Sequence, residues 1–183
     1  MTSAIEATQA WFEKAVIGLN LCPFAKAVHS KRQIRWVLST AHDAEALLAD
    51  LLAEMRLLAA ADPQQIDTTL IVHPHALQDF GHFNAFLEVA DAALEELDLH
   101  GVLQVASFHP QYRFAGTPKA DVSNNTNRSP YPTLHLLRED SVARAVAAFP
   151  EAATIYERNI ATLQKLGRAG WSDLMTDLLK DKG

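Results

Sequence analysis

The chain has 183 residues, of which 49% are hydrophobic and 21% are charged. These values are close to those of globular proteins and exclude a disordered chain, a collagen-like fibre and a coiled coil. Sixteen lysines and arginines against twenty-two aspartates and glutamates give a formal charge of −6, which argues against a surface built to neutralise nucleic-acid phosphates. A single cysteine, Cys22, excludes an intramolecular disulfide and fits a reducing compartment.

Targeting and membrane segments are not evident in the sequence. The first residues lack the basic start and apolar run of a secretory signal, and no stretch approaches the ~18 apolar residues of a membrane span. We therefore expect a cytoplasmic protein with neither membrane nor nucleic acid as a partner. The length fits one domain over residues 1–183.

Strand and helix patterns alternate along the first part of the chain. In chain order they are a helix from the capping box of Ser3 and Glu6 to about 18–20, a strand over 34–38, a helix from 40–43 to about 58, a strand over 68–72, a helix from about 79 to 97 and a strand over 102–108. This order predicts parallel pairing through helical crossovers, so the second and third strands should end at one edge of the sheet. His73 and His109 follow these strands and should share that edge.

The last part of the chain is mostly helical. Residues 133–137 are expected to form a fourth strand, and a helix starting after Pro132 is the alternative. Further helices are expected over 142–149, from Pro150 to Gly167, and over 172–180. The fold class is therefore α/β: a single sheet of about four strands, at least partly parallel, with packed helices and a long loop at 110–132.

The 110–132 loop is the most informative segment. Loops longer than ~12–15 residues are uncommon and are usually functional or disordered. Tyr112, Phe114 and Tyr131 can anchor this one to the protein body, and its four prolines restrict the backbone, so we expect it to be ordered.

The same loop is basic, although the chain is acidic. Arginine side chains and a run of asparagines suit a carboxylate or phosphate group. The residues expected to bind such an anion are Arg113, Lys119, Asn124, Asn127, Arg128 and Tyr131. An ordinary surface loop, whose asparagines bond their own backbone, is the alternative.

Histidines supply the candidate chemistry. His109 and His73 are expected to move a proton or contact the ligand, with Asp121 orienting a histidine or acting as a base. His73, His75 and His109 also have a spacing that a metal ion can use, although Pro74 breaks the pleat and no acidic residue lies beside them. Cys22 has apolar neighbours, which favours a buried and inert thiol.

Four segments together resemble a known family: residues 18–25, residues 72–75, residues 107–117 and residues 127–132. The chain is similar to the bacterial family catalogued as domain of unknown function 1415. That resemblance implies a bacterial cytoplasmic protein and carries no reaction, cofactor or catalytic residue.

Three functions stay open from the sequence. The first is a small α/β enzyme acting on a small anionic metabolite at the C-terminal strand edge, where ligands of open α/β sheets usually bind. The second is a non-catalytic nucleotide- or anion-binding module that uses the same loop. The third is a metal-dependent hydrolase that uses His73, His75 and His109. The sequence points to no particular cofactor or oligomeric state.

Overall fold

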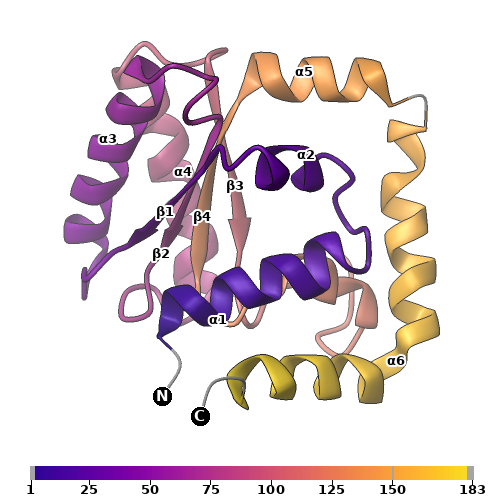
Figure 1. Cartoon of the computed structure of the whole chain (residues 1–183). Helices are drawn as coiled ribbons and strands as arrows, with labels where there is room; N and C mark the ends of the chain where they lie inside the picture. Colours follow the sequence, from indigo (N-terminus) through magenta and orange to yellow (C-terminus); the bar gives the residue numbers. More distant parts are fainter. Residues whose placement is uncertain (1–2, 150, 181–183) are drawn as a thin grey trace.

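The computed structural model describes residues 3–149 and 151–180. Helices flank a sheet of four strands (Figure 1). The helices are α1 (Ala4–Trp11), the π-helix η1 (Phe12–Ile17), α2 (Ala25–Ser30), α3 (Ala44–Ala60), α4 (Phe80–Glu96), the 3-10 helix η2 (Val122–Asn127), α5 (Glu139–Ala148), the 3-10 helix η3 (Ala152–Thr154) and α6 (Ile155–Lys180). The strands are β1 (Ile34–Leu38), β2 (Thr68–Val72), β3 (Leu103–Phe108) and β4 (Thr133–Arg138).

The sheet mixes parallel and antiparallel pairs. Its strand order is β1-β2-β4-β3, with β1 parallel to β2 and β4 antiparallel to both of its neighbours. The strands β2 and β3 therefore run in the same direction, as the crossover pattern predicts. They do not pair with each other, because β4 lies between them. Sequence order alone could not show this insertion, since β4 is the last of the four strands in the chain.

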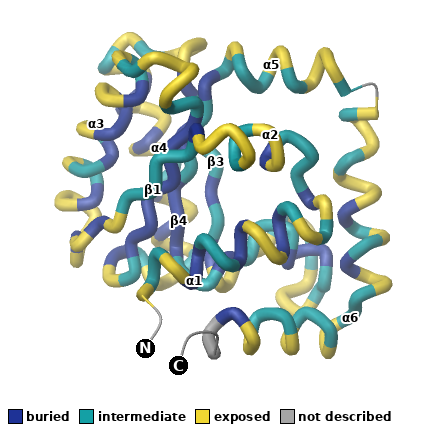
Figure 2. The backbone as a smooth tube through the Cα atoms, in the orientation of Figure 1, coloured by how far each residue is buried: buried dark blue, intermediate teal, exposed yellow. Residues whose placement is uncertain are grey.

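One face of the sheet is covered by α3 and α4. The helix α3 starts at the N-cap Asp43, whose side chain accepts from Ala46 N–H, and α4 starts at Asp79 in the same way. Their apolar stripes pack with Ile71, Leu134 and Leu136 into the larger hydrophobic core. In the backbone view these inward stripes are the buried parts of the helices (Figure 2).

The opposite face is covered over only part of its width. The capping box of Ser3 and Glu6 starts α1, and the hydrophobic side of α1 and η1 packs Trp11, Phe12 and Val16 against Leu70 of β2. In Figure 1, α1, α2, α5 and α6 lie on this side of the sheet, around the part formed by β3 and β4.

The C-terminal half departs from expectation in details. Residues 133–138 form a strand, so the helix alternative is wrong. The long helix is interrupted at Gly167, as expected, where a φ of 68° favours glycine. Pro150, expected to open that helix, lies outside the described residues, and the sequence analysis missed the short helix α2.

Candidate functional site

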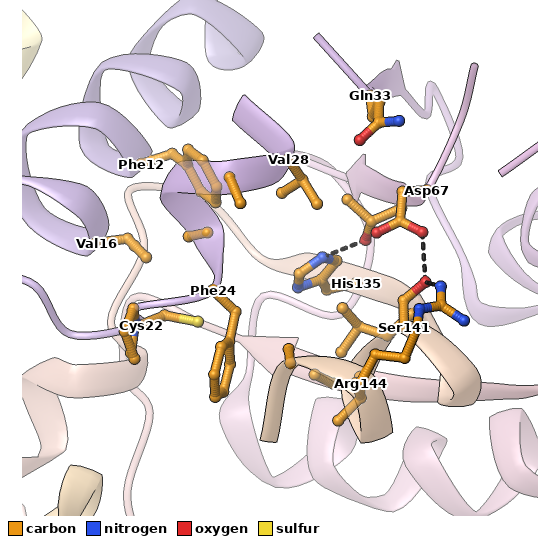
Figure 3. Close-up of a pocket in the computed structure, with 18 of the residues that line it drawn as sticks. Phe12, Val16, Cys22, Phe24, Val28, Gln33, Asp67, His135, Ser141 and Arg144 are labelled. Carbon is orange, nitrogen blue, oxygen red and sulfur yellow. Dashed lines mark hydrogen bonds between the residues drawn. The ribbon is translucent and has the colours of Figure 1, made fainter. Parts of the chain in front are cut away.

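A cavity lies over β3 and β4, on the face not covered by α3 and α4. Its volume is about 710 Å³, which is in the range of small-molecule sites. We call it the sheet-face pocket. Its apolar wall comes from η1, the segment before α2, α2, α5 and the strands (Figure 3), and includes Phe12, Val16, Leu21, Pro23, Phe24, Val28, Phe108, Leu137, Val142 and Phe149.

The alternation of side chains along two strands creates this space. In β3, Gln104, Ala106 and Phe108 line the pocket, while Leu103 and Val105 belong to the core on the other face. In β4, His135 and Leu137 line the pocket, and Ala106 is the cross-strand partner of His135. The small Ala106 side chain therefore leaves room beside the imidazole.

His135 is the most informative polar residue of the pocket. The Thr68 hydroxyl donates to the Leu136 carbonyl at 2.6 Å, so the 2.6 Å contact between Thr68 Oγ1 and His135 Nε2 is a hydrogen bond donated by the ring N–H. The other ring nitrogen, Nδ1, then carries the lone pair, and in Figure 3 it faces the pocket interior. Burial lowers the pKa of His135 to about 4, so the ring is neutral at pH 7.

A second polar group lies at the pocket wall near α5. The Ser141 hydroxyl donates to Asp67 Oδ1 at 2.5 Å, and Arg144 Nη2 donates to Ser141 Oγ at 3.0 Å. Lys31 also lines the pocket. Both Lys31 and Arg144 are exposed, so their positive charges lie at the mouth, while Asp67 supplies the negative charge of this group.

Cys22 lines the same pocket. Burial raises the pKa of its thiol, which keeps it protonated near neutral pH and therefore a weak nucleophile. A reactive cysteine–histidine pair needs a thiolate beside an imidazolium. Here burial favours the neutral thiol of Cys22 and the neutral imidazole of His135.

The histidines singled out from the sequence do meet at one edge of the sheet. β2 and β3 end opposite the same β4 residue, Thr133, and the His73 amide donates to Pro132 O at 3.0 Å. Both imidazoles pack on Phe83, with ring centroids 5.7 Å away for His73 and 5.0 Å for His109. The expected juxtaposition is therefore present.

These two histidines are buried, with 0% of His73 and 1% of His109 exposed. His109 Nδ1 accepts from the Gln111 amide at 3.0 Å, which leaves its Nε2–H to donate to the Leu77 carbonyl at 3.2 Å. His73 donates from Nδ1 to the Ala76 carbonyl at 3.1 Å, and its Nε2 has no hydrogen-bond partner among the described residues. Burial lowers the pKa of His73 to about 4 and also lowers that of His109.

The metal-dependent alternative gains no support from the geometry. His75 is exposed and stacks on His42, with ring centroids 4.9 Å apart. Both nitrogens of His109 are hydrogen-bonded to backbone groups. In residues 3–149 and 151–180, no group of three or more histidine, cysteine, aspartate or glutamate side chains is arranged to hold a metal ion.

The Arg128 side chain cross-links the 110–132 loop through hydrogen bonds. Its guanidinium donates to the carbonyls of Tyr112 at 3.1 Å and Lys119 at 2.8 Å, and to Asn125 Oδ1 at 3.2 Å. Arg113 similarly donates to the Thr117 carbonyl at 2.7 Å. Both arginines therefore hold the loop in one conformation.

The asparagines of the loop also bond mainly to backbone. Asn124 is fully buried, its Oδ1 accepts from the Phe114 amide, and its side-chain amide donates to Pro118 O. Asn127 donates to Ser107 O of β3 at 3.2 Å and lines the sheet-face pocket. Asp121 accepts from the Ser123 amide at 2.9 Å and so caps η2.

The two other predicted loop residues are placed differently. Lys119 is exposed, and its carbonyl serves Arg128. Tyr131 is half-buried, and its carbonyl accepts from the hydroxyls of Ser129 and Thr133. The predicted ligand-binding residues therefore share one ordered loop, and of them Asn127 alone lines the sheet-face pocket.

The sequence analysis missed His135, Ala106 and Arg144 as pocket residues. The available signal was a lone histidine in the otherwise apolar alternation of residues 133–138. This signal was weak because the pocket forms only when α2, α5 and the edge of the sheet come together.

Fold and pocket define a mixed α/β protein with one open sheet and a large apolar pocket on one of its faces. The chain belongs to the family described as protein of unknown function (DUF1415), which matches residues 3–173. This match confirms the resemblance found in the sequence. No match was found among curated proteins or among solved structures. In the described ranges, every helix is too short or too polar to span a bilayer.

Proposed function

We propose that the protein binds a small organic molecule with an apolar body in the sheet-face pocket. The main support for this proposal is the protonation and hydrogen bonding of the His135 ring. Thr68 occupies one ring nitrogen, so the other nitrogen is an unprotonated acceptor inside a wall of aromatic and aliphatic side chains. A ligand hydroxyl, amide or protonated acid can donate to this nitrogen.

The charges at the mouth favour an acidic group on the ligand. Lys31 and Arg144 lie at the exposed rim, and Asp67 is already engaged by Ser141. A carboxylate or phosphate at the rim pairs with these cations while the apolar part enters the pocket. The ligand class is therefore a small amphipathic organic anion.

Binding fits this pocket better than catalysis. A general base works best when its pKa lies near the working pH, and burial lowers the pKa of His135 to about 4. Burial also raises the pKa of the Cys22 thiol. Both groups are neutral at pH 7, which suits hydrogen bonding to a ligand and not proton transfer or thiolate attack.

An enzyme site at the strand ends, with His109, His73 and Asp121 in catalytic roles, is the second candidate function. One observation favours it: His73 Nε2 is a fully buried acceptor without a hydrogen-bond partner in the described part of the chain. Catalytic sites are one place where such unsatisfied groups occur.

The cytoplasmic location expected from the sequence stays a prediction.

Filling the pocket tests the first candidate. Ala106→Phe places an aromatic ring beside His135, where the space is empty, and Ala92→Phe makes the same change at an exposed position of α4. The probe is anilinonaphthalene sulfonate, an aromatic anion whose fluorescence rises in apolar pockets. We expect saturable binding by the wild type and by Ala92→Phe, and loss of binding by Ala106→Phe.

Replacing the acceptor tests the role of His135. His135→Leu keeps an apolar side chain of similar size and removes the ring nitrogens. For ligands found in a screen of hydroxyl-bearing aromatic acids, we expect affinity to fall about five- to tenfold, as the loss of one hydrogen bond predicts. Equal affinity in wild type, His135→Leu and Ala106→Phe would place the ligand elsewhere and contradict the proposal.

A further inference from the structure

A second, smaller pocket lies between the 110–132 loop and α6, on the other side of η2 from the sheet-face pocket. Its volume is about 230 Å³, and its wall includes Asn125, Arg128, Arg168 and Trp171. We call it the loop–α6 pocket. Thr126 and Asn127, the neighbouring residues of η2, line the sheet-face pocket instead, so the two sites share a wall and no lining residue.

Two arginines from distant parts of the chain meet in this pocket. Arg128 comes from the end of the loop, and Arg168 follows the Gly167 break in α6. Arg168 Nη2 donates to the carbonyl of Ala120 at 3.0 Å, which ties α6 to the loop. The two arginines come to the same pocket because the chain turns at Gly167, and the sequence analysis did not predict this.

Neither of these arginines forms a salt bridge within the part of the chain that the structure describes. The hydrogen bonds of Arg128 go to the neutral oxygens of Tyr112, Lys119 and Asn125. Within the described residues, neither Arg128 nor Arg168 has a carboxylate oxygen within the 4.0 Å of a salt bridge. Arg128 is also partly buried, and burial lowers its pKa, which is the direction expected for a cation that is desolvated and not paired with a nearby anion.

The wall of the loop–α6 pocket has N–H donors that can still bind a ligand. A guanidinium carries five N–H groups, and among residues 3–149 and 151–180 the hydrogen bonds use three of them in Arg128 and one in Arg168. Asp121 is the acidic residue of the wall; it accepts from the Ser123 amide at 2.9 Å, and the positive charge of Arg168 contributes to lowering its pKa. With two arginines and one aspartate, the wall keeps a positive charge.

We propose that the loop–α6 pocket is a binding site for a phosphate group, held by forked hydrogen bonds from Arg128 and Arg168. A phosphate oxyanion supplies the missing negative charge and accepts the spare N–H groups. The group is either inorganic phosphate or the phosphoryl group of a small metabolite. Trp171 bounds the pocket and restricts the size of the substituent on the phosphoryl group.

Arg168→Gln is the decisive variant, because Arg168 is exposed and its side chain makes one hydrogen bond to the described part of the chain. Arg56→Gln removes the same charge from an exposed position of α3 and is the matched control. Binding of inorganic phosphate and of glycerol phosphate is measured by calorimetry at constant ionic strength. The fluorescence of Trp171, assigned with Trp171→Phe, reports occupancy locally.

We expect the wild type and Arg56→Gln to bind phosphate equally and Arg168→Gln to bind it at least about tenfold more weakly, as the loss of a charge-assisted contact predicts. Arg168→Lys should recover part of the affinity. Tighter binding of glycerol phosphate than of phosphate would identify a metabolite as the ligand, and the reverse would identify the free ion.

Two outcomes would overturn the phosphate site: no saturable phosphate binding by the wild type, or equal weakening in Arg168→Gln and Arg56→Gln. Ala106→Phe, which closes the sheet-face pocket, should leave phosphate binding unchanged. The phosphate site and the proposed binding function can therefore fail independently.

Discussion

The Thr68 hydroxyl on β2 and the His135 imidazole on β4 lie 2.6 Å apart, although 67 residues separate them in the chain. Their strands are neighbours, and both side chains face the pocket side of the sheet. Because Thr68 donates to a backbone carbonyl, it accepts from His135 and selects the Nε2–H tautomer.

This contact predicts the protonation state of His135. With its pKa lowered to about 4 by burial, the ring should stay neutral, with the proton on Nε2, above about pH 5. Nitrogen chemical shifts of the labelled imidazole measure both properties. Thr68→Val removes the acceptor and should populate the other tautomer. An imidazolium signal from His135 at pH 6 would disprove the assignment.

Acid stability should depend on His73. Its pKa is about 4 in the folded protein and about 6.5 in the unfolded chain, so the unfolded chain takes up the proton first as pH falls. The contribution of His73 to the free energy of unfolding should therefore decrease by about 1.4 kcal/mol per pH unit between about pH 6.5 and 4, and this contribution should be constant above that range. Urea unfolding at several pH values measures the slope.

The control for this slope is a histidine on the surface. His73→Leu should make the dependence on pH shallower by about 1.4 kcal/mol per pH unit, because His135 and His109, whose pKa values burial also lowers, still contribute. His100→Gln, at an exposed position, should leave the dependence unchanged. Identical slopes for the two variants would show that His73 does not titrate between these pH values.

Arg128 should matter for stability as well as for anion binding. Its side chain makes three hydrogen bonds that cross the 110–132 loop, which an ammonium cannot reproduce. Arg128→Lys should lower the free energy of unfolding by about 1–3 kcal/mol. Arg113→Lys replaces a guanidinium that makes one hydrogen bond to a carbonyl, so it should lower the free energy of unfolding less. Equal losses in chemical denaturation would contradict this role.

Arg138 should be a strong determinant of stability. Its buried guanidinium donates to the carbonyls of Leu58, Ala61 and Ile66, where α3 ends and the chain enters β2. Arg138→Met keeps much of the apolar stem and leaves these carbonyls unpaired. It should therefore lower the free energy of unfolding by about 2–4 kcal/mol. Arg144→Gln, at an exposed position, should change thermal stability little. A small effect at Arg138 would show that water replaces the guanidinium.

The thiol of Cys22 should react slowly and report on the pocket. Burial raises its pKa, so alkylation at neutral pH should be at least about tenfold slower than for a free cysteine. Saturating anilinonaphthalene sulfonate should slow it further, because Cys22 lines the sheet-face pocket. Alkylation that is fast, or that is indifferent to the bound probe, would place the thiol outside the pocket. Mass spectrometry of the alkylated protein measures the rate.

Local patterns in the sequence determined most elements. The capping residues Ser3, Asp43 and Asp79 start the three helices where the sequence predicts them, because a side chain that satisfies the first N–H groups acts within one turn. The common edge of His73 and His109 was also predictable, since a helical crossover returns the chain in the same direction. The order of the 110–132 loop was predictable from its aromatic and proline content.

Only the tertiary structure decided where the cavities lie. The strand β4, the last of the four in the chain, lies between β2 and β3, and it carries His135 to the open face beside Ala106. The turn at Gly167 similarly brings Arg168 to Arg128. Local propensity acts over a few residues, whereas a pocket depends on which distant segments pack together and how far they cover a sheet. The sequence thus determined most of the elements, and the packing of β4, α5 and α6 decided the sites.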